Sequence, residues 1–125
     1  MSSPAAGGSA PGAGARPGPD WEELLAAACR GDGLAAAYQP IVDTARGTVV
    51  GYEALARFPG YAEKNPEVWF SAARAHGRSA ELEAAALRTA LAARSTLPPN
   101  CFLTLNVSPE LLTTEEIRSV WRNEG

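Results

Sequence analysis

Residues 38–58, YQPIVDTARGTVVGYEALARF, place charged side chains inside an otherwise apolar strand pattern. Successive side chains of a strand point to opposite faces of the sheet, so Glu53 and Arg57 fall on the same face. The opposite face is uniformly apolar and carries Val50, Tyr52, Ala54, Ala56 and Phe58. This pattern predicts either a solvated edge strand or a strand whose polar face lines a cavity, and periodicity alone does not decide between the two.

The order of the residues in and after this stretch resembles a known family. YQPIVD at residues 38–43, a turn with Gly47, and then Gly51, Glu53-Ala54-Leu55 and Arg57 are similar to the opening of the EAL domain, the bacterial cyclic di-GMP phosphodiesterase family. Further matches keep the family's spacing, namely Trp69, Ala73, Gly77, Leu82, Glu83 and the run LNVS at residues 105–108. The resemblance covers residues 34–112.

The resemblance implies an α/β fold, the N-terminal portion of a (β/α)8 TIM-like barrel with an antiparallel first strand. An EAL domain has about 240 residues, so this portion is expected to be incomplete. We expect three regions. These are a disordered Ala/Gly/Pro-rich tail at residues 1–19, an N-terminal helix and linker at 20–33, and a partial EAL domain at 34–125.

The local sequence predicts the order of the elements. Asp20 and Glu23 form a capping box that opens a short helix, and Asn65-Pro66 and Gly77 mark the start and end of another. Pro40 places the first strand at an edge or limits its pairing at that residue. We expect strands at 34–42 and 48–58, paired as an antiparallel hairpin, and then helices at 66–76 and 79–95. A strand at 101–108 follows and is expected to be parallel to its neighbour. A capping box at Thr113–Glu116 opens a last helix, which reaches Arg122.

Charge and composition restrict the partners. The net charge of −3 and the lack of a Lys/Arg cluster argue against binding to DNA or RNA polymers. No signal peptide or apolar run of about 18 residues is present, so we expect a cytoplasmic protein without a membrane anchor. Cys29 and Cys101 are interpreted as small buried apolar residues, and His76 as a solvent-facing or helix-capping residue.

Polar side chains also share one face of the strand at 101–108. This face carries Thr104, Asn106 and Ser108, together with Phe102. Residues near the C-terminal ends of neighbouring barrel strands converge, so Glu53 and Asn106 could meet. A carboxylate and an amide carbonyl suit a hard cation such as Mg²⁺ or Mn²⁺, although two ligands do not make a site.

The resemblance assigns roles to these residues. It implies that Glu53 is a catalytic metal ligand and Asn106 the second ligand. Arg57 would contact a substrate phosphate, and Gln39 and Leu55 would touch the cyclic dinucleotide. The family uses two metal ions to open cyclic di-GMP to linear pGpG in bacterial second-messenger signalling.

The resemblance also implies residues that this chain lacks. Beyond Asn106 the family supplies a glutamate on the next strand, a paired aspartate motif, a lysine and a further glutamate, and the part of the family sequence that carries them is not present in these 125 residues. We therefore expect the N-terminal part of a phosphodiesterase that is inactive as this chain, unless a dimer through the barrel supplies ligands in trans. Two alternatives stay open: a non-catalytic module that binds cyclic di-GMP or a protein, and a non-functional truncated product.

Overall fold

The computed structural model describes residues 18–124 of the chain. Most of the expected tail at 1–19 therefore lies outside the described residues. In chain order the elements are α1 (Trp21–Cys29), β1 (Ala35–Asp43), β2 (Thr48–Arg57), α2 (Pro66–Ala75), α3 (Ser79–Ala92), the 3₁₀ turn η1 (Arg94–Thr96), β3 (Phe102–Thr104), the 3₁₀ turn η2 (Pro109–Leu111) and α4 (Glu115–Glu124).

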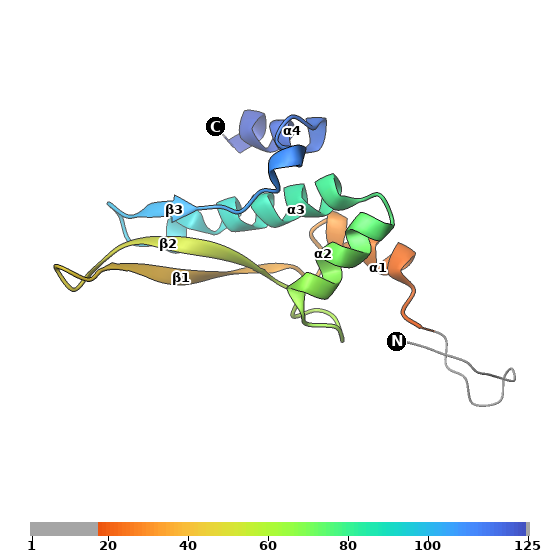
Figure 1. Cartoon of the computed structure of the whole chain (residues 1–125), viewed down its shortest axis with the longest axis horizontal. Helices are drawn as coiled ribbons and strands as arrows, with labels where there is room; N and C mark the ends of the chain where they lie inside the picture. The colour runs from red at the N-terminus through yellow and green to blue at the C-terminus, as the bar shows by residue number, and fades with distance from the viewer. Residues whose placement is uncertain (1–17, 125) are drawn as a thin grey trace, which may run out of the picture.

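The strands form one sheet in the order β1-β2-β3 (Figure 1). β1 and β2 are antiparallel, and β2 and β3 are parallel. The predicted hairpin, the edge position of the Pro40 strand and the parallel pair are confirmed. This arrangement matches part of a TIM-like barrel with an antiparallel first strand.

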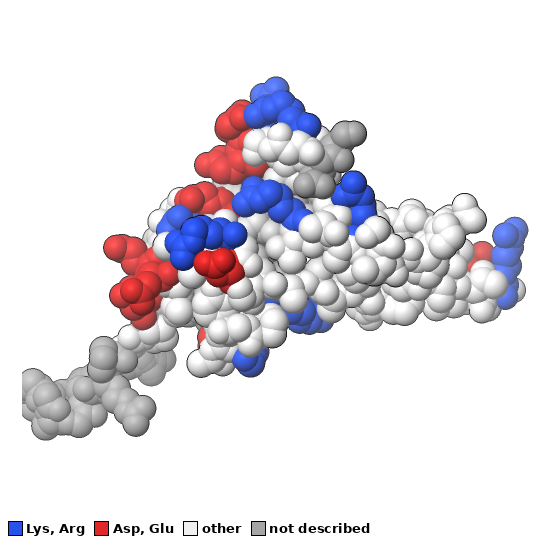
Figure 2. Space-filling view, turned by 180° about the vertical axis from the view of Figure 1, so that it is seen from behind, with Lys and Arg blue, Asp and Glu red and all other residues white. Residues whose placement is uncertain are grey.

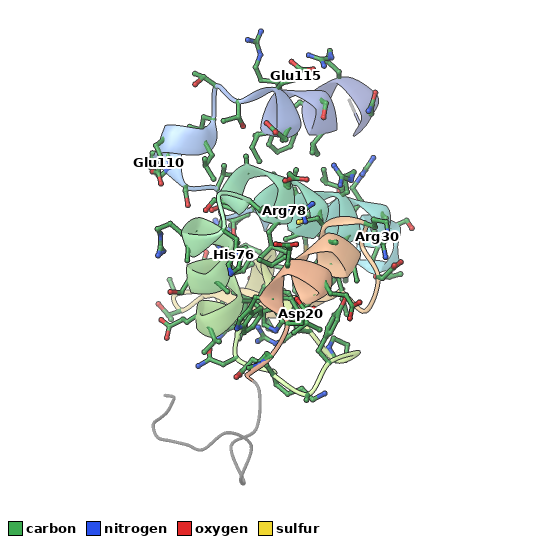
Figure 3. All side chains as sticks on the ribbon, turned by 90° about the vertical axis from the view of Figure 1, so that its right-hand side faces the viewer. Asp20, Arg30, His76, Arg78, Glu110 and Glu115 are labelled. Carbon is green, nitrogen blue, oxygen red and sulfur yellow. The ribbon has the colours of Figure 1, made fainter. Side chains whose placement is uncertain are left out.

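Helix α3 is the central helix of the molecule. It contacts β1 and β2 on one side and packs against α1, α2 and α4. Figure 3 shows α4 on one side of α3 and helices α1 and α2 on the other. The Tyr38 hydroxyl donates to the Ala90 carbonyl oxygen at 2.6 Å, and burial raises the pKa of this phenol. This bond ties β1 to α3, so the apolar face of the sheet is the covered face.

Two apolar clusters form the core. The first joins α1, the end of β2, α2 and α3 and contains Leu25, Ala28, Phe58, Trp69, Ala73 and Leu82. The second lies between α3 and α4 and contains Ala84, Leu87, Ile117 and Val120. Of the helices in residues 18–124, none has the length and apolar character needed to cross a bilayer.

The predicted helix ends are largely confirmed. Asp20 Oδ1 accepts from the Glu23 amide at 3.2 Å, and Asn65 Oδ1 accepts from the Glu67 amide at 3.0 Å. His76 is exposed and is the C-cap of α2, and Gly77 follows it with a φ of 70°. The predicted cap of α4 is wrong by one residue. Thr114, rather than Thr113, accepts from a first-turn amide, that of Ile117.

Two further predictions need correction. The strand expected at 101–108 is paired only over Phe102–Thr104, because the following residues leave the sheet toward α3. Cys29 and Cys101 are free and half-buried rather than buried. Cys29 lies near the end of α1 beside charged groups of α3, and partial burial raises the pKa of its thiol while Arg78 lowers it.

Candidate functional site

Glu53 lies in the middle of the sheet. It pairs with Gln39 of β1 on one side and with Thr104 of β3 on the other, so the three residues form a row on one face. Asn106 Nδ2 donates to Glu53 Oε2 at 3.1 Å across a sequence separation of 53 residues. The expected meeting of Glu53 and Asn106 is therefore present, because β2 and β3 are parallel and end at the same edge.

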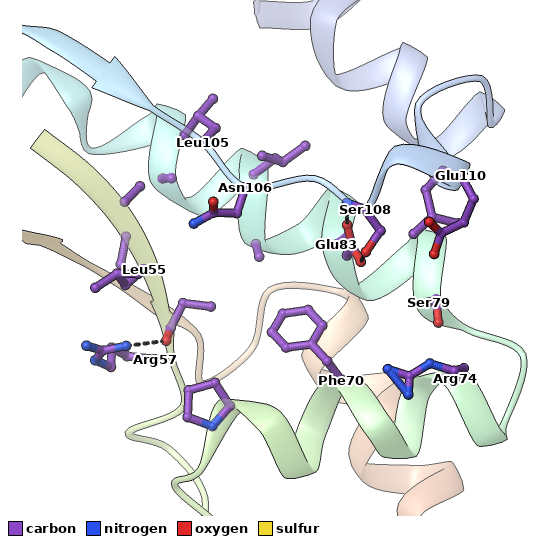
Figure 4. Close-up of a pocket in the computed structure, with 18 residues that line it drawn as sticks. Leu55, Arg57, Phe70, Arg74, Ser79, Glu83, Leu105, Asn106, Ser108 and Glu110 are labelled. Atoms are coloured by element: carbon purple, nitrogen blue, oxygen red, sulfur yellow. Dashed lines mark hydrogen bonds between the residues drawn. The ribbon is translucent and has the colours of Figure 1, made fainter.

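Leu55 and Arg57 follow Glu53 on the same face of β2. Their partners in β1 are Ala37 and Ala35, whose small side chains leave room above the strand. Arg57 is exposed, and its Nη1 donates to the Ala56 carbonyl oxygen at 2.9 Å (Figure 4). A guanidinium has five N–H donors, so this single bond leaves capacity for an anion.

A cavity of about 620 Å³ lies beside residues 54–57, the C-terminal part of β2. It is bounded by β2, the segment after β3, and helices α2 and α3 (Figure 4). Leu55, Arg57 and Asn106 line it, whereas Gln39 and Glu53 do not belong to its lining. Because β2 is the central strand, the edge-strand interpretation is wrong, and its polar face does border a cavity.

Most residues that line this cavity are not among the predicted site residues, and they include Phe70, Arg74, Glu83 and Glu110. They come from α2, α3 and η2. Helical periodicity could indicate which face Phe70 occupies on α2, but the distance between these elements has no local sequence signal. Glu83 is the exception, because it is part of the spacing that resembles the EAL family.

Comparison with known protein families shows the family to which the chain belongs. The EAL domain family profile matches residues 22–122. The chain belongs to the EAL domain family. No curated protein matches the sequence.

A solved structure supports the EAL fold. The chain is similar to the crystal structure of the *Xanthomonas citri* FimX EAL domain in complex with c-diGMP, with a TM-score of 0.67 and 21% sequence identity. The match covers 83% of this chain and 42% of the FimX chain. This EAL chain thus spans less than half of that structure's length, and the likeness shows the fold.

The donor set at the centre of the EAL sheet fits a hard divalent cation. Neighbouring ligands of an octahedral Mg²⁺ with bonds of about 2.1 Å lie about 3 Å apart. The atom of Asn106 that lies 3.1 Å from Glu53 Oε2 is the amide nitrogen, which donates a hydrogen bond and cannot ligate a cation. Rotation of the amide group by half a turn would put its carbonyl oxygen there and give two oxygen ligands the spacing that one ion needs. Within residues 18–124, no group of three or more His, Cys, Asp or Glu side chains is placed to hold a metal ion.

Charged side chains are unevenly distributed over the surface. Figure 2 shows Lys, Arg, Asp and Glu mixed over the helical part of the molecule, while the length of the hairpin is largely uncharged up to its tip. Arg57 and Arg74 both line the cavity. Glu83 and Glu110 line the same cavity, so its charged side chains are of both signs. Arg57 shares a face of β2 with Glu53, and its guanidinium has the planar geometry that suits a phosphate.

Proposed function

We propose that the polar face of β2 and the adjoining cavity are part of a cyclic di-GMP site of an EAL-type phosphodiesterase. Glu53 and Asn106 would hold one Mg²⁺ or Mn²⁺ ion, Arg57 would bind a phosphate, and Gln39 and Leu55 would contact the dinucleotide. The observation that supports this proposal most directly is the Asn106–Glu53 hydrogen bond, with Arg57 four residues farther along the same face of β2.

Each side chain has a defined task in this proposal. The planar guanidinium of Arg57 can bind two phosphate oxygens at once, which orients the phosphodiester. Glu53, as an ionised carboxylate, provides negative charge where a cation is needed. Divalent cations, when bound here, would help to form hydroxide from water and to stabilise the charge that develops as cyclic di-GMP opens to linear pGpG.

A second candidate function is binding of cyclic di-GMP without hydrolysis. The described residues favour it for the chain by itself, because they supply only two cation ligands, and two-metal catalysis needs more. We therefore propose that the 125-residue chain binds the nucleotide but does not turn it over, and that hydrolysis requires further ligands.

Binding can be tested by isothermal titration of cyclic di-GMP into the purified chain with Mg²⁺ present. Arg57→Ala should weaken binding at least tenfold, because a charged hydrogen bond contributes about 1.5–3 kcal/mol. Arg46→Ala is the matched control. Arg46 lies in the hairpin turn at the far end of the sheet, 81% exposed, beside Asp43. Equal affinity of the Arg57→Ala variant and the unaltered chain would contradict the assigned role.

Hydrolysis can be tested by separating cyclic di-GMP from pGpG chromatographically after incubation with Mg²⁺ or Mn²⁺. The chain should release no pGpG. Turnover that Glu53→Ala abolishes would contradict this expectation and would indicate that a second copy supplies the missing ligands.

A further inference from the structure

The backbone around Asn106 lies beyond the end of the sheet pairing. The parallel ladder between β2 and β3 ends at Glu53 and Thr104. Asn106 comes two residues later, where the ladder no longer fixes the chain. Other contacts must therefore hold the segment at 105–108 in the position that brings the Asn106 amide to Glu53.

Glu83 of α3 makes such a contact. Its Oε1 accepts from the Ser108 amide at 2.8 Å, and its Oε2 accepts from the Ser108 hydroxyl at 2.5 Å. Both residues are half-buried and line the cavity wall, where Figure 4 shows them side by side. One carboxylate thus accepts both donors of a residue two positions from Asn106.

The Ser108 side chain is directed to Glu83 rather than to the turn that follows it. Ser108 directly precedes η2, a place where a serine oxygen ordinarily accepts from an amide of the following turn. Here its side chain makes no capping bond, and the turn is closed by the Ser108 carbonyl oxygen, which accepts from Leu111 at 2.9 Å. The hydroxyl donates back to α3 instead.

Apolar contacts alone would fix this segment less tightly. Leu105 and Val107 pack on the cluster between α3 and α4. Such contacts hold the segment against α3 but are non-directional, so they tolerate a small shift along the helix. The two hydrogen bonds to Glu83 are directional and involve a charged acceptor, which makes them the stronger constraint on register.

We propose that Glu83, acting through Ser108, is a positioning residue that holds Asn106 against Glu53. Its effect on cation binding rests on the proposed function, whereas its effect on the Asn106–Glu53 contact does not. The Glu83 carboxylate accepts from both Ser108 donors. A glutamine could keep both contacts, by accepting from the Ser108 amide and donating to the Ser108 hydroxyl oxygen, because a hydroxyl both donates and accepts. Alanine at position 83 removes both contacts.

The test compares Glu83→Ala, Ser108→Ala and Ser108→Thr with the unaltered chain. Glu81→Ala is the matched control, since Glu81 lies on the same helix but pairs with Arg78 rather than with the segment at 105–108. The readout is the pair of Asn106 side-chain amide signals in a ¹⁵N–¹H correlation spectrum, followed during a Mn²⁺ titration. Backbone signals in the same spectrum report whether each variant is folded.

In the Glu83→Ala and Ser108→Ala variants, the Asn106 signals should move toward those of a free amide. About tenfold more Mn²⁺ should be needed to broaden them, as for other groups that orient metal ligands. Ser108→Thr keeps the hydroxyl and should restore both properties. If Glu83→Ala does not fold, the Ser108→Ala and Ser108→Thr pair gives the answer by itself.

Unchanged Asn106 signals in folded Glu83→Ala and Ser108→Ala variants would overturn the positioning role. If these signals move as expected but Mn²⁺ never broadens them, even in the unaltered chain, the positioning role stands and the cation site of the proposed function fails. The two proposals therefore fail in different ways.

Discussion

At the scale of single residues, Trp69 organises the end of the sheet that carries Arg57. Its ring is fully buried and stacks on Phe58 with centroids 4.5 Å apart and planes 5° apart. Its indole N–H donates to the Glu63 carbonyl oxygen at 2.8 Å, in the loop that follows β2. Because Phe58 directly follows Arg57 in the chain, this packing fixes the point from which Arg57 projects.

Trp69→Ala should lower the free energy of unfolding by about 3–5 kcal/mol, the usual cost of truncating a buried aromatic residue. Trp121→Ala is the matched control, because Trp121 is 42% exposed on α4 and should cost far less. Urea denaturation followed by circular dichroism measures both. Similar losses in the two variants would show that the Trp69 cluster is not the structural centre described above.

Gly51 leaves space for the ring of Phe102. A Cβ at this position would lie 2.6 Å from the ring of Phe102, its partner in β3. Gly51→Ala should therefore destabilise the chain or displace the ring, and Phe102→Ala should relieve the clash. In a double-mutant cycle we expect a coupling of about 0.5–3 kcal/mol. Strictly additive effects would argue against this contact.

At the scale of secondary structure elements, local signals predicted the helix starts well and the strand β3 poorly. The caps at Asp20 and Asn65 and the end of α2 at Gly77 depend on residues within one turn, so the sequence contains the necessary information. β3 ends at Thr104, and the chain after it contacts α3 through Ser108 and Glu83, 25 residues earlier in the chain. No local pattern could have predicted that contact.

The junction of α2 and α3 contains Gly77, whose backbone has a left-handed conformation. Gly77 has a φ of 70° with open space around its Cα, so an added side chain meets no atom but strains the backbone. Gly77→Ala should cost about 1–2 kcal/mol. Gly77→Asn should cost less, because asparagine tolerates this conformation. Thermal denaturation of the two variants checks the order, and a larger loss for the asparagine variant would contradict it.

The ion pair in the first turn of α3 should make a small contribution to the pH dependence of the free energy of unfolding. The hydrogen bond from Arg78 lowers the pKa of Glu81 below its ordinary value of 4.5. A carboxyl whose pKa is lower in the folded state stabilises the protein above its unfolded pKa, and this contribution is lost as the pH falls through the folded pKa.

Glu81→Gln should therefore reduce the loss of stability below about pH 4.5. The pair is partly exposed to solvent, with 27% and 41% of the two side chains accessible, so we expect a few tenths of a kcal/mol. Denaturation midpoints measured between pH 3 and pH 6 test this. A steeper acid dependence in the variant would contradict the sign.

At the scale of the whole molecule, the described residues form an open sheet that is covered on one face by α3. The other face carries Gln39, Glu53, Arg57 and Asn106, together with Phe102, which is 51% exposed. The α/β class and the strand directions were predictable because the order of strands and helices restricts the topology. The cavity was not predictable, because Phe70, Arg74 and Glu83 reach it from separate elements.

The central claim is that this open face and its cavity bind cyclic di-GMP. The most direct measurement is a titration of the ¹⁵N-labelled chain with cyclic di-GMP in the presence of Mg²⁺, followed by ¹⁵N–¹H correlation spectra. We predict shift changes centred on Gln39, Glu53, Leu55, Arg57 and Asn106. No shift changes, or changes confined to the separate groove along α2 near Val68 and His76, would contradict the claim.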